Sequence, residues 1–202
     1  MSFILASASP RRRELLAACG MLFQIIPSSI DEHPLPDEPA AAYVQRLALA
    51  KAETVAQQQP GAVVLGADTI VTIDGLLLGK PQSLDEARQM LHRLRGKMHE
   101  VLTGMAVVSR WMPDSPGHQH ASEVVVSRVL MRHFAASTID WYIATGEPVD
   151  KAGAYAVQGL GAALVERVEG SYTNVVGLPL TETLALLRRF GIAELAPHRA
   201  RE

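Results

Sequence analysis

Apolar positions in the first third of the chain form short runs that alternate with helical stretches. Residues 3–6 are apolar and break into small and basic residues at 7–13, with Pro10 at the expected first position of a helix. This segment therefore predicts a strand, a turn and a helix. Apolar residues recur at helical spacing over 40–58, which predicts a long helix. The run at 62–67 is continuously apolar, which is typical of a central strand covered on both faces.

The rest of the chain mixes hairpin signals with helices. Asp74 and Gly75 lie between two apolar runs and favour a tight hairpin turn. Ser83 and Glu86 have capping-box spacing at the start of a helix that Gly96 ends. Further strands are expected near 22–27, 99–109, 122–134 and 162–168, and further helices near 137–146 and 179–190. Strands and helices without strict alternation predict an α/β fold with a mixed twisted sheet flanked by helices.

Length and composition restrict the class of protein. A chain of 202 residues makes one largish domain or two small lobes, and we expect one domain over 1–193 with a frayed tail at 194–202. The net charge of −2 argues against a nucleic-acid binder, and no apolar stretch reaches membrane-spanning length. The start lacks the layout of a signal peptide. A single cysteine, Cys19, predicts a buried structural thiol and fits a reducing cytoplasm.

The first candidate site is the turn at 7–13. Free backbone N–H groups at a helix start, the hydroxyls of Ser7 and Ser9 and the guanidinium groups of Arg11 and Arg12 together suit a polyphosphate. An ordinary strand–helix junction with solvated arginines is the alternative, and the segment alone does not decide between them.

Acidic and basic residues further along the chain offer matching chemistry. Asp68 directly follows the apolar run at 62–67, at the expected carboxyl end of a strand, where it could hold Mg²⁺ or position a water. Glu32 is a candidate second metal ligand, and Lys51 and Lys80 are candidates for neutralising phosphate oxygens. Each residue also has a purely structural alternative: Asp68 could cap its own turn, and Glu32 could be a solvated loop charge. The two lysines could lie on the surface.

Other chemistries have no signature in the sequence. The seven histidines are scattered, and His118 and His120 lie in a loop without cysteine or acidic partners at zinc-ligand spacing. A nucleophile elbow, a dinucleotide-binding glycine motif and a Walker lysine loop are all absent. The residues by themselves predict a phosphate-handling α/β enzyme that uses a carboxylate and lysines.

A series of short blocks in fixed order extends this prediction. The blocks are Ser7–Arg12, Tyr43–Ala52, Gly66–Val71, Gly79–Pro81, Leu94–Gly104, Asp150–Gly159 and Asn174–Pro179. In sequence and order they resemble the Maf family of nucleotide pyrophosphatases. Within that family, Asp68-Thr69 and the block around Gln158 are similar to the branch that acts on dTTP and UTP. One alternative is the branch that acts on 7-methyl-GTP. Another is a nucleotide-binding regulator of cell division without turnover, because the family was named for inhibiting septum formation.

The resemblance implies hydrolysis of a nucleoside triphosphate to monophosphate and pyrophosphate with a divalent cation, Mg²⁺ or Mn²⁺. It implies Asp68 as the catalytic acidic residue and Arg11, Thr69 and Gln158 as positions that set substrate choice. The remaining pocket positions it implies are Ser7, Arg12, Glu32, Lys51 and Lys80. It also implies a two-lobed fold with a central cleft, related to the inosine triphosphate pyrophosphatases, in a usually dimeric cytoplasmic enzyme. Arg13 departs from the family pattern, and we expect it to face solvent.

Overall fold

The computed structural model describes residues 2–110 and 117–192, so the tail expected at 194–202 lies outside the described residues. Its strands are β1 (Ser2–Leu5), β2 (Gln24–Ile25), β3 (Ala62–Ile73), β4 (Leu76–Leu78), β5 (Met98–Ser109), β6 (Gln119–Met131) and β7 (Val165–Glu169). Its α-helices are α1 (Pro10–Ala18), α2 (Ala40–Gln58), α3 (Leu84–Leu94), α4 (Ala136–Ala144), α5 (Tyr172–Val176) and α6 (Leu180–Arg188). Short 3-10 turns cover Glu147–Asp150, Ala152–Ala154 and Gly159–Leu164.

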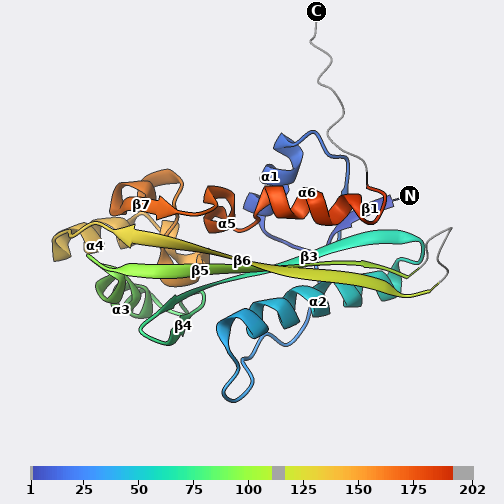
Figure 1. The fold of residues 1–202 in the computed structure, drawn as a ribbon. Helices are drawn as coiled ribbons and strands as arrows, with labels where there is room; N and C mark the ends of the chain where they lie inside the picture. The colour runs from blue at the N-terminus through green and yellow to red at the C-terminus, as the bar shows by residue number, and fades with distance from the viewer. Residues whose placement is uncertain (1, 111–116, 193–202) are drawn as a thin grey trace, which may run out of the picture. The chain divides into compact units, whose positions relative to one another are not determined.

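The strands form one mixed sheet, as the sequence predicts. β1 pairs in parallel with β2 and β3, whereas β3–β4 and β6–β7 are antiparallel. The sheet has seven strands in the order β2-β1-β3-β5-β6-β7, with β4 paired to β3 (Figure 1). The expected α/β class with helices flanking a mixed sheet is therefore confirmed.

The chain divides into two compact units. Among the described residues, the first comprises 2–68, 103–110, 117–124 and 177–192, and the second comprises 69–102 and 125–176. The long strands β3, β5 and β6 contribute residues to both. Among the described residues, no helix combines the length and apolar character needed to cross a membrane.

In the first unit, α2 packs against one face of the sheet and α1 and α6 lie on the other side (Figure 1). The contact with α2 is close because Gly66 of β3 and Gly104 of β5 have no side chains. A Cβ on Gly66 would lie 2.2 Å from the Ala48 carbonyl oxygen, and one on Gly104 would lie 2.3 Å from the Val44 carbonyl oxygen. Because alternate residues of a strand share a face, this packing also turns Asp68 toward α2.

The second unit has its own core beneath α3 and α4, in which Leu91, Ile139 and Tyr142 are fully buried. Glu147 organises its loops: the carboxylate accepts hydrogen bonds from the Tyr142 hydroxyl at 2.8 Å and from the Gly161 backbone N–H at 2.9 Å. It also accepts one from the Leu160 N–H at 3.0 Å. The turn at 159–164 is therefore attached to a half-buried anion.

Several boundaries differ from the sequence prediction. β3 does not end at residue 67 but continues to Ile73, before the predicted hairpin turn at Asp74 and Gly75. β2 is only two residues long, and β6 begins at Gln119 rather than near 122. β7 begins at Val165 because the preceding residues form a 3-10 turn instead of the expected strand at 162.

Candidate functional site

The turn between β1 and α1 has the predicted geometry. Ser9 is the N-cap of α1 and its hydroxyl accepts the Arg12 backbone N–H at 3.5 Å, with Pro10 in the first turn. The Ser7 hydroxyl accepts the Ser9 N–H at 3.2 Å. Both serines thus shape the start of the helix, where backbone N–H groups favour anions.

Arg12 is buried rather than solvated, so the simple junction with solvated arginines is wrong for this residue. Its Nε donates to the Gly177 carbonyl at 2.8 Å, and its Nη1 donates to the Ala67 carbonyl at 2.8 Å and the Ser7 hydroxyl at 3.3 Å. Burial lowers the pKa of Arg12, while the charges of Asp68 and Glu32 act in the opposite direction. The guanidinium therefore connects the segments that carry Ser7, Ala67 and Gly177, and it places a positive charge beside the turn between β1 and α1. Arg13 is exposed, as expected.

A lysine between two carboxylates forms the centre of the site. The Nζ of Lys51 lies 2.6 Å from Asp68 Oδ1 and 2.7 Å from Glu32 Oε1. The Lys51 and Asp68 side chains are 10% and 12% exposed, whereas that of Glu32 is 53% exposed. Lys51 is therefore not a surface lysine, and α2 and β3 hold its ion pair with Asp68 away from most solvent.

The expectation that Asp68 follows the end of a strand, or caps a turn there, is wrong. Asp68 lies inside β3, and its neighbours on both sides remain in the strand. It reaches the site because it shares a face with Gly66, where the absence of a side chain lets α2 and Lys51 approach. The strand was predicted to end at residue 67 because a carboxylate is rarely found at a buried strand position.

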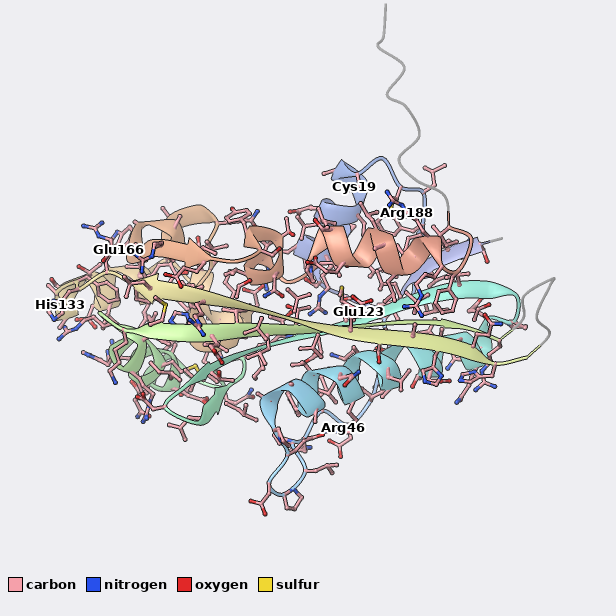
Figure 2. The ribbon with its side chains drawn as sticks, in the orientation of Figure 1. Cys19, Arg46, Glu123, His133, Glu166 and Arg188 are labelled. Atoms are coloured by element: carbon pink, nitrogen blue, oxygen red, sulfur yellow. The ribbon has the colours of Figure 1, made fainter. Side chains whose placement is uncertain are left out.

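Two side chains of α2 hold the loop that carries Glu32. The Tyr43 hydroxyl donates to the Glu32 carbonyl at 2.9 Å, and Arg46, labelled on α2 in Figure 2, donates to both carboxylate oxygens of Glu38 at 2.6 and 2.7 Å. Arg46 also donates to the His33 carbonyl at 3.2 Å. Burial and the charges of Asp68 and Glu32 raise the pKa of Tyr43 to about 12, and hydrogen bonds from Arg46 lower the pKa of Glu38 to about 2.

Sequence reasoning gave Tyr43 and Arg46 no function. The helical spacing of Tyr43, Leu47 and Lys51 was a usable signal, because residues four apart lie on one side of a helix. That spacing places the loop anchor and the buried lysine on the same face of α2.

The structure brings together Ser7, Arg12, Glu32, Lys51 and Asp68 in the first unit, where Ser9 and half-buried Arg11 also lie. Thr69, Lys80 and Gln158 belong to the second unit. Thr69 follows Asp68 in β3 and is half-buried. Lys80 is exposed, and its carbonyl accepts the Gln82 side-chain amide at 3.1 Å. Gln158 is exposed and precedes the turn anchored by Glu147.

Two further expectations are corrected. Cys19 is half-buried rather than buried. His118 and His120 do have an acidic partner, because Glu53 of α2 lies beside them. Local sequence spacing cannot reveal a ligand supplied by a distant helix.

The α/β fold and the carboxylate–lysine site agree with the class of protein that comparison with known proteins identifies. The family model described as "Maf-like protein" matches residues 2–190. The chain belongs to the Maf family.

Relatives in this family are similar over nearly their whole length. A protein of Myxococcus xanthus named dTTP/UTP pyrophosphatase is 51% identical, covering 94% of this chain and 92% of its own. Proteins of the same name from Anaeromyxobacter dehalogenans and Moorella thermoacetica are 52% and 53% identical, covering 93% and 94% of this chain and 93% and 95% of their own. A solved nucleoside-triphosphatase, named as a dITP/XTP pyrophosphatase, from Mycobacterium abscessus has 13% identity and a TM-score of 0.43, covering 98% of both chains.

Proposed function

We propose that this protein is a nucleotide pyrophosphatase that hydrolyses dTTP and UTP to the monophosphate and pyrophosphate. The observation that carries the proposal is the buried ion pair of Lys51 with Asp68, which the half-exposed Glu32 joins, beside the N-terminus of α1. The names of relatives about half identical to this chain support the substrate assignment. A protein that only binds a nucleotide does not need a carboxylate of this kind beside its phosphate site.

The donor set at this site fits a divalent cation. Asp68 and Glu32 both contact one Lys51 ammonium, so their carboxylates lie within reach of a shared cation. Carboxylate oxygens are the ligands that Mg²⁺ and Mn²⁺ prefer. Glu32 and Asp68 would hold the ion, which would supply charge neutralisation for the triphosphate and a more acidic water.

Phosphate binding is assigned to the turn before α1 and to the lysines. The start of α1 offers backbone N–H groups and the hydroxyls of Ser7 and Ser9, and Arg11 and Arg12 add positive charge. Lys51 and Lys80 would neutralise phosphate oxygens as negative charge moves toward the leaving pyrophosphate. For Lys51 this requires that its ammonium be shared between the carboxylates and the substrate.

The reaction assigned to the site is attack of water on the α-phosphorus in line with the departing pyrophosphate. Asp68 would orient this water and accept its proton, and Lys51 fixes the carboxylate through the 2.6 Å contact. The new bond joins the water oxygen to the α-phosphorus, and the bond to the bridging oxygen of the pyrophosphate breaks. A carboxylate is a weak base at neutral pH, so orientation is the larger part of its contribution.

Base recognition is assigned to Thr69 and Gln158. Both are uncharged, and a glutamine amide offers one donor and one acceptor group, which matches the imide edge of uracil and thymine. CTP presents the reverse pattern, and the mismatched hydrogen bonds to cytosine would lower kcat/KM for CTP by roughly tenfold to a hundredfold. The proposal also includes a cytoplasmic homodimer, and light scattering during gel filtration checks the dimer.

The test is kcat/KM for dTTP, UTP, CTP, GTP and 7-methyl-GTP with Mg²⁺ or Mn²⁺, measured by pyrophosphate release. We expect dTTP and UTP to exceed CTP by at least about tenfold. A preference for 7-methyl-GTP would replace the substrate assignment, and binding of dTTP without product would favour a regulator of cell division. Asp68→Asn serves as the inactive control.

A further inference from the structure

A second cluster of ligating side chains lies in the first unit, apart from the residues assigned to nucleotide hydrolysis. It consists of Glu53 on α2, His118 just before β6 and His120 in β6. One ligand atom from each lies within 4.8 Å of the others. The Nε2 of His118 is 2.8 Å from Glu53 Oε1, and the two imidazole ring centroids are 5.5 Å apart.

The backbone explains why these three side chains converge. Residues two apart on an extended chain project to the same side, so His118 and His120 present both rings in one direction. Glu53 is supplied by α2, which packs against the sheet through Gly66 and Gly104. The histidine rings at the start of β6 therefore meet a carboxylate from a helix.

The donor set has a definite chemical preference. Two imidazoles and one carboxylate are three protein ligands of the kind that bind zinc with water in the fourth position. Imidazole suits Zn²⁺, Cu²⁺ and Ni²⁺, whereas Mg²⁺ prefers the all-oxygen set at Glu32 and Asp68. The Glu53 and His118 side chains are 23% and 41% exposed, so an ion can enter from solvent.

We propose that Glu53, His118 and His120 bind one divalent transition-metal ion, with zinc as the preferred physiological ion. The bound ion connects α2 to the start of β6 and stabilises the folded first unit. The site acts independently of pyrophosphate release, because none of its ligands belongs to the Glu32–Lys51–Asp68 cluster.

The experiment uses the full chain without a histidine tag, stripped of metal and held in excess Mg²⁺. Zn²⁺ is titrated against a chromogenic chelator. We expect one Zn²⁺ per chain, with affinity reduced at least tenfold in Glu53→Gln, His118→Ala and His120→Ala. His92→Ala removes an exposed histidine of α3 and should leave zinc binding unchanged. Asp68→Asn should also retain it, which separates this site from the proposed catalytic one.

Thermal unfolding gives a second readout, because an ion that binds only the folded state raises Tm. Zn²⁺ should raise the Tm of the unaltered chain and of Asp68→Asn, but not of His120→Ala. Folding of the variants is checked by their Tm without zinc, since these side chains are at least partly exposed. Equal zinc affinity in the unaltered chain and His118→Ala, or loss of binding in Asp68→Asn alone, overturns the proposal.

Discussion

Replacement of Asp68 by asparagine removes one negative charge from the Lys51 cluster and keeps the shape of the side chain. Removing one partner of a fully buried ion pair costs about 3–5 kcal/mol. The loss should be smaller here, because Lys51 keeps the half-exposed Glu32 carboxylate at 2.7 Å and the asparagine amide oxygen still accepts a hydrogen bond. We therefore expect the free energy of unfolding to fall by about 1–3 kcal/mol.

Urea unfolding at pH 7.5 measures this loss, and a double-mutant cycle with Lys51→Met isolates the pair. Lys51→Met alone leaves Asp68 and Glu32 near one another without their shared cation, so the double variant should be more stable than the two separate losses imply. We expect a coupling energy of at least about 1 kcal/mol. Asp85→Asn is the matched control, because that carboxylate is 89% exposed and its loss should change stability by less than about 0.5 kcal/mol.

Activity is measured on the same proteins. Asp68→Asn should lower kcat for dTTP by at least about a hundredfold while the protein remains folded. The ion-pair argument would be refuted if the stability loss of the double variant equalled the sum of the losses of Asp68→Asn and Lys51→Met within about 0.5 kcal/mol. Near-normal turnover by folded Asp68→Asn would refute its catalytic assignment.

Three further predictions concern residues around the site and the second core. Gly66→Ala places a Cβ 2.2 Å from a backbone oxygen of α2, so stability should fall by about 2–3 kcal/mol and dTTP turnover should fall with it, measured by urea unfolding and pyrophosphate release. Glu147→Gln removes an acceptor from the turn at 159–164, and hydrogen exchange there should become faster, by mass spectrometry. Burial lowers the pKa of His99 to about 4 from an ordinary 6.5, so the unfolded chain binds its proton first as pH falls. Stability should then decrease by up to about 3 kcal/mol between pH 6.5 and 4, and His99→Gln should remove this part of the pH dependence.

The sequence predicted elements well where one pattern dominated. α2 has the predicted bounds of 40–58 because its apolar stripe is long and regular, and the Ser9 cap and Pro10 specified the start of α1. The turn at 159–164 was expected to be partly strand because its alanines and leucine carry no clear period. Gly159 at its start, with a positive φ of 64°, and the Glu147 carboxylate decide its conformation instead.

The site was predictable only in part for a similar reason. Asp68 and Lys51 stood out as charged residues beside apolar patterns, but their ion pair depends on how closely α2 approaches β3 at Gly66. That distance is a tertiary property with no local signal. The approach of Glu53 to His118 depends likewise on which strand end lies beside α2.

The most direct test of the central claim is the position of solvent oxygen after dTTP hydrolysis in water enriched in heavy oxygen. Attack on the α-phosphorus predicts that the label appears in dTMP and not in pyrophosphate, with phosphorus NMR showing pyrophosphate as the only other product. Label in pyrophosphate, or release of inorganic phosphate and dTDP, would contradict the proposed reaction.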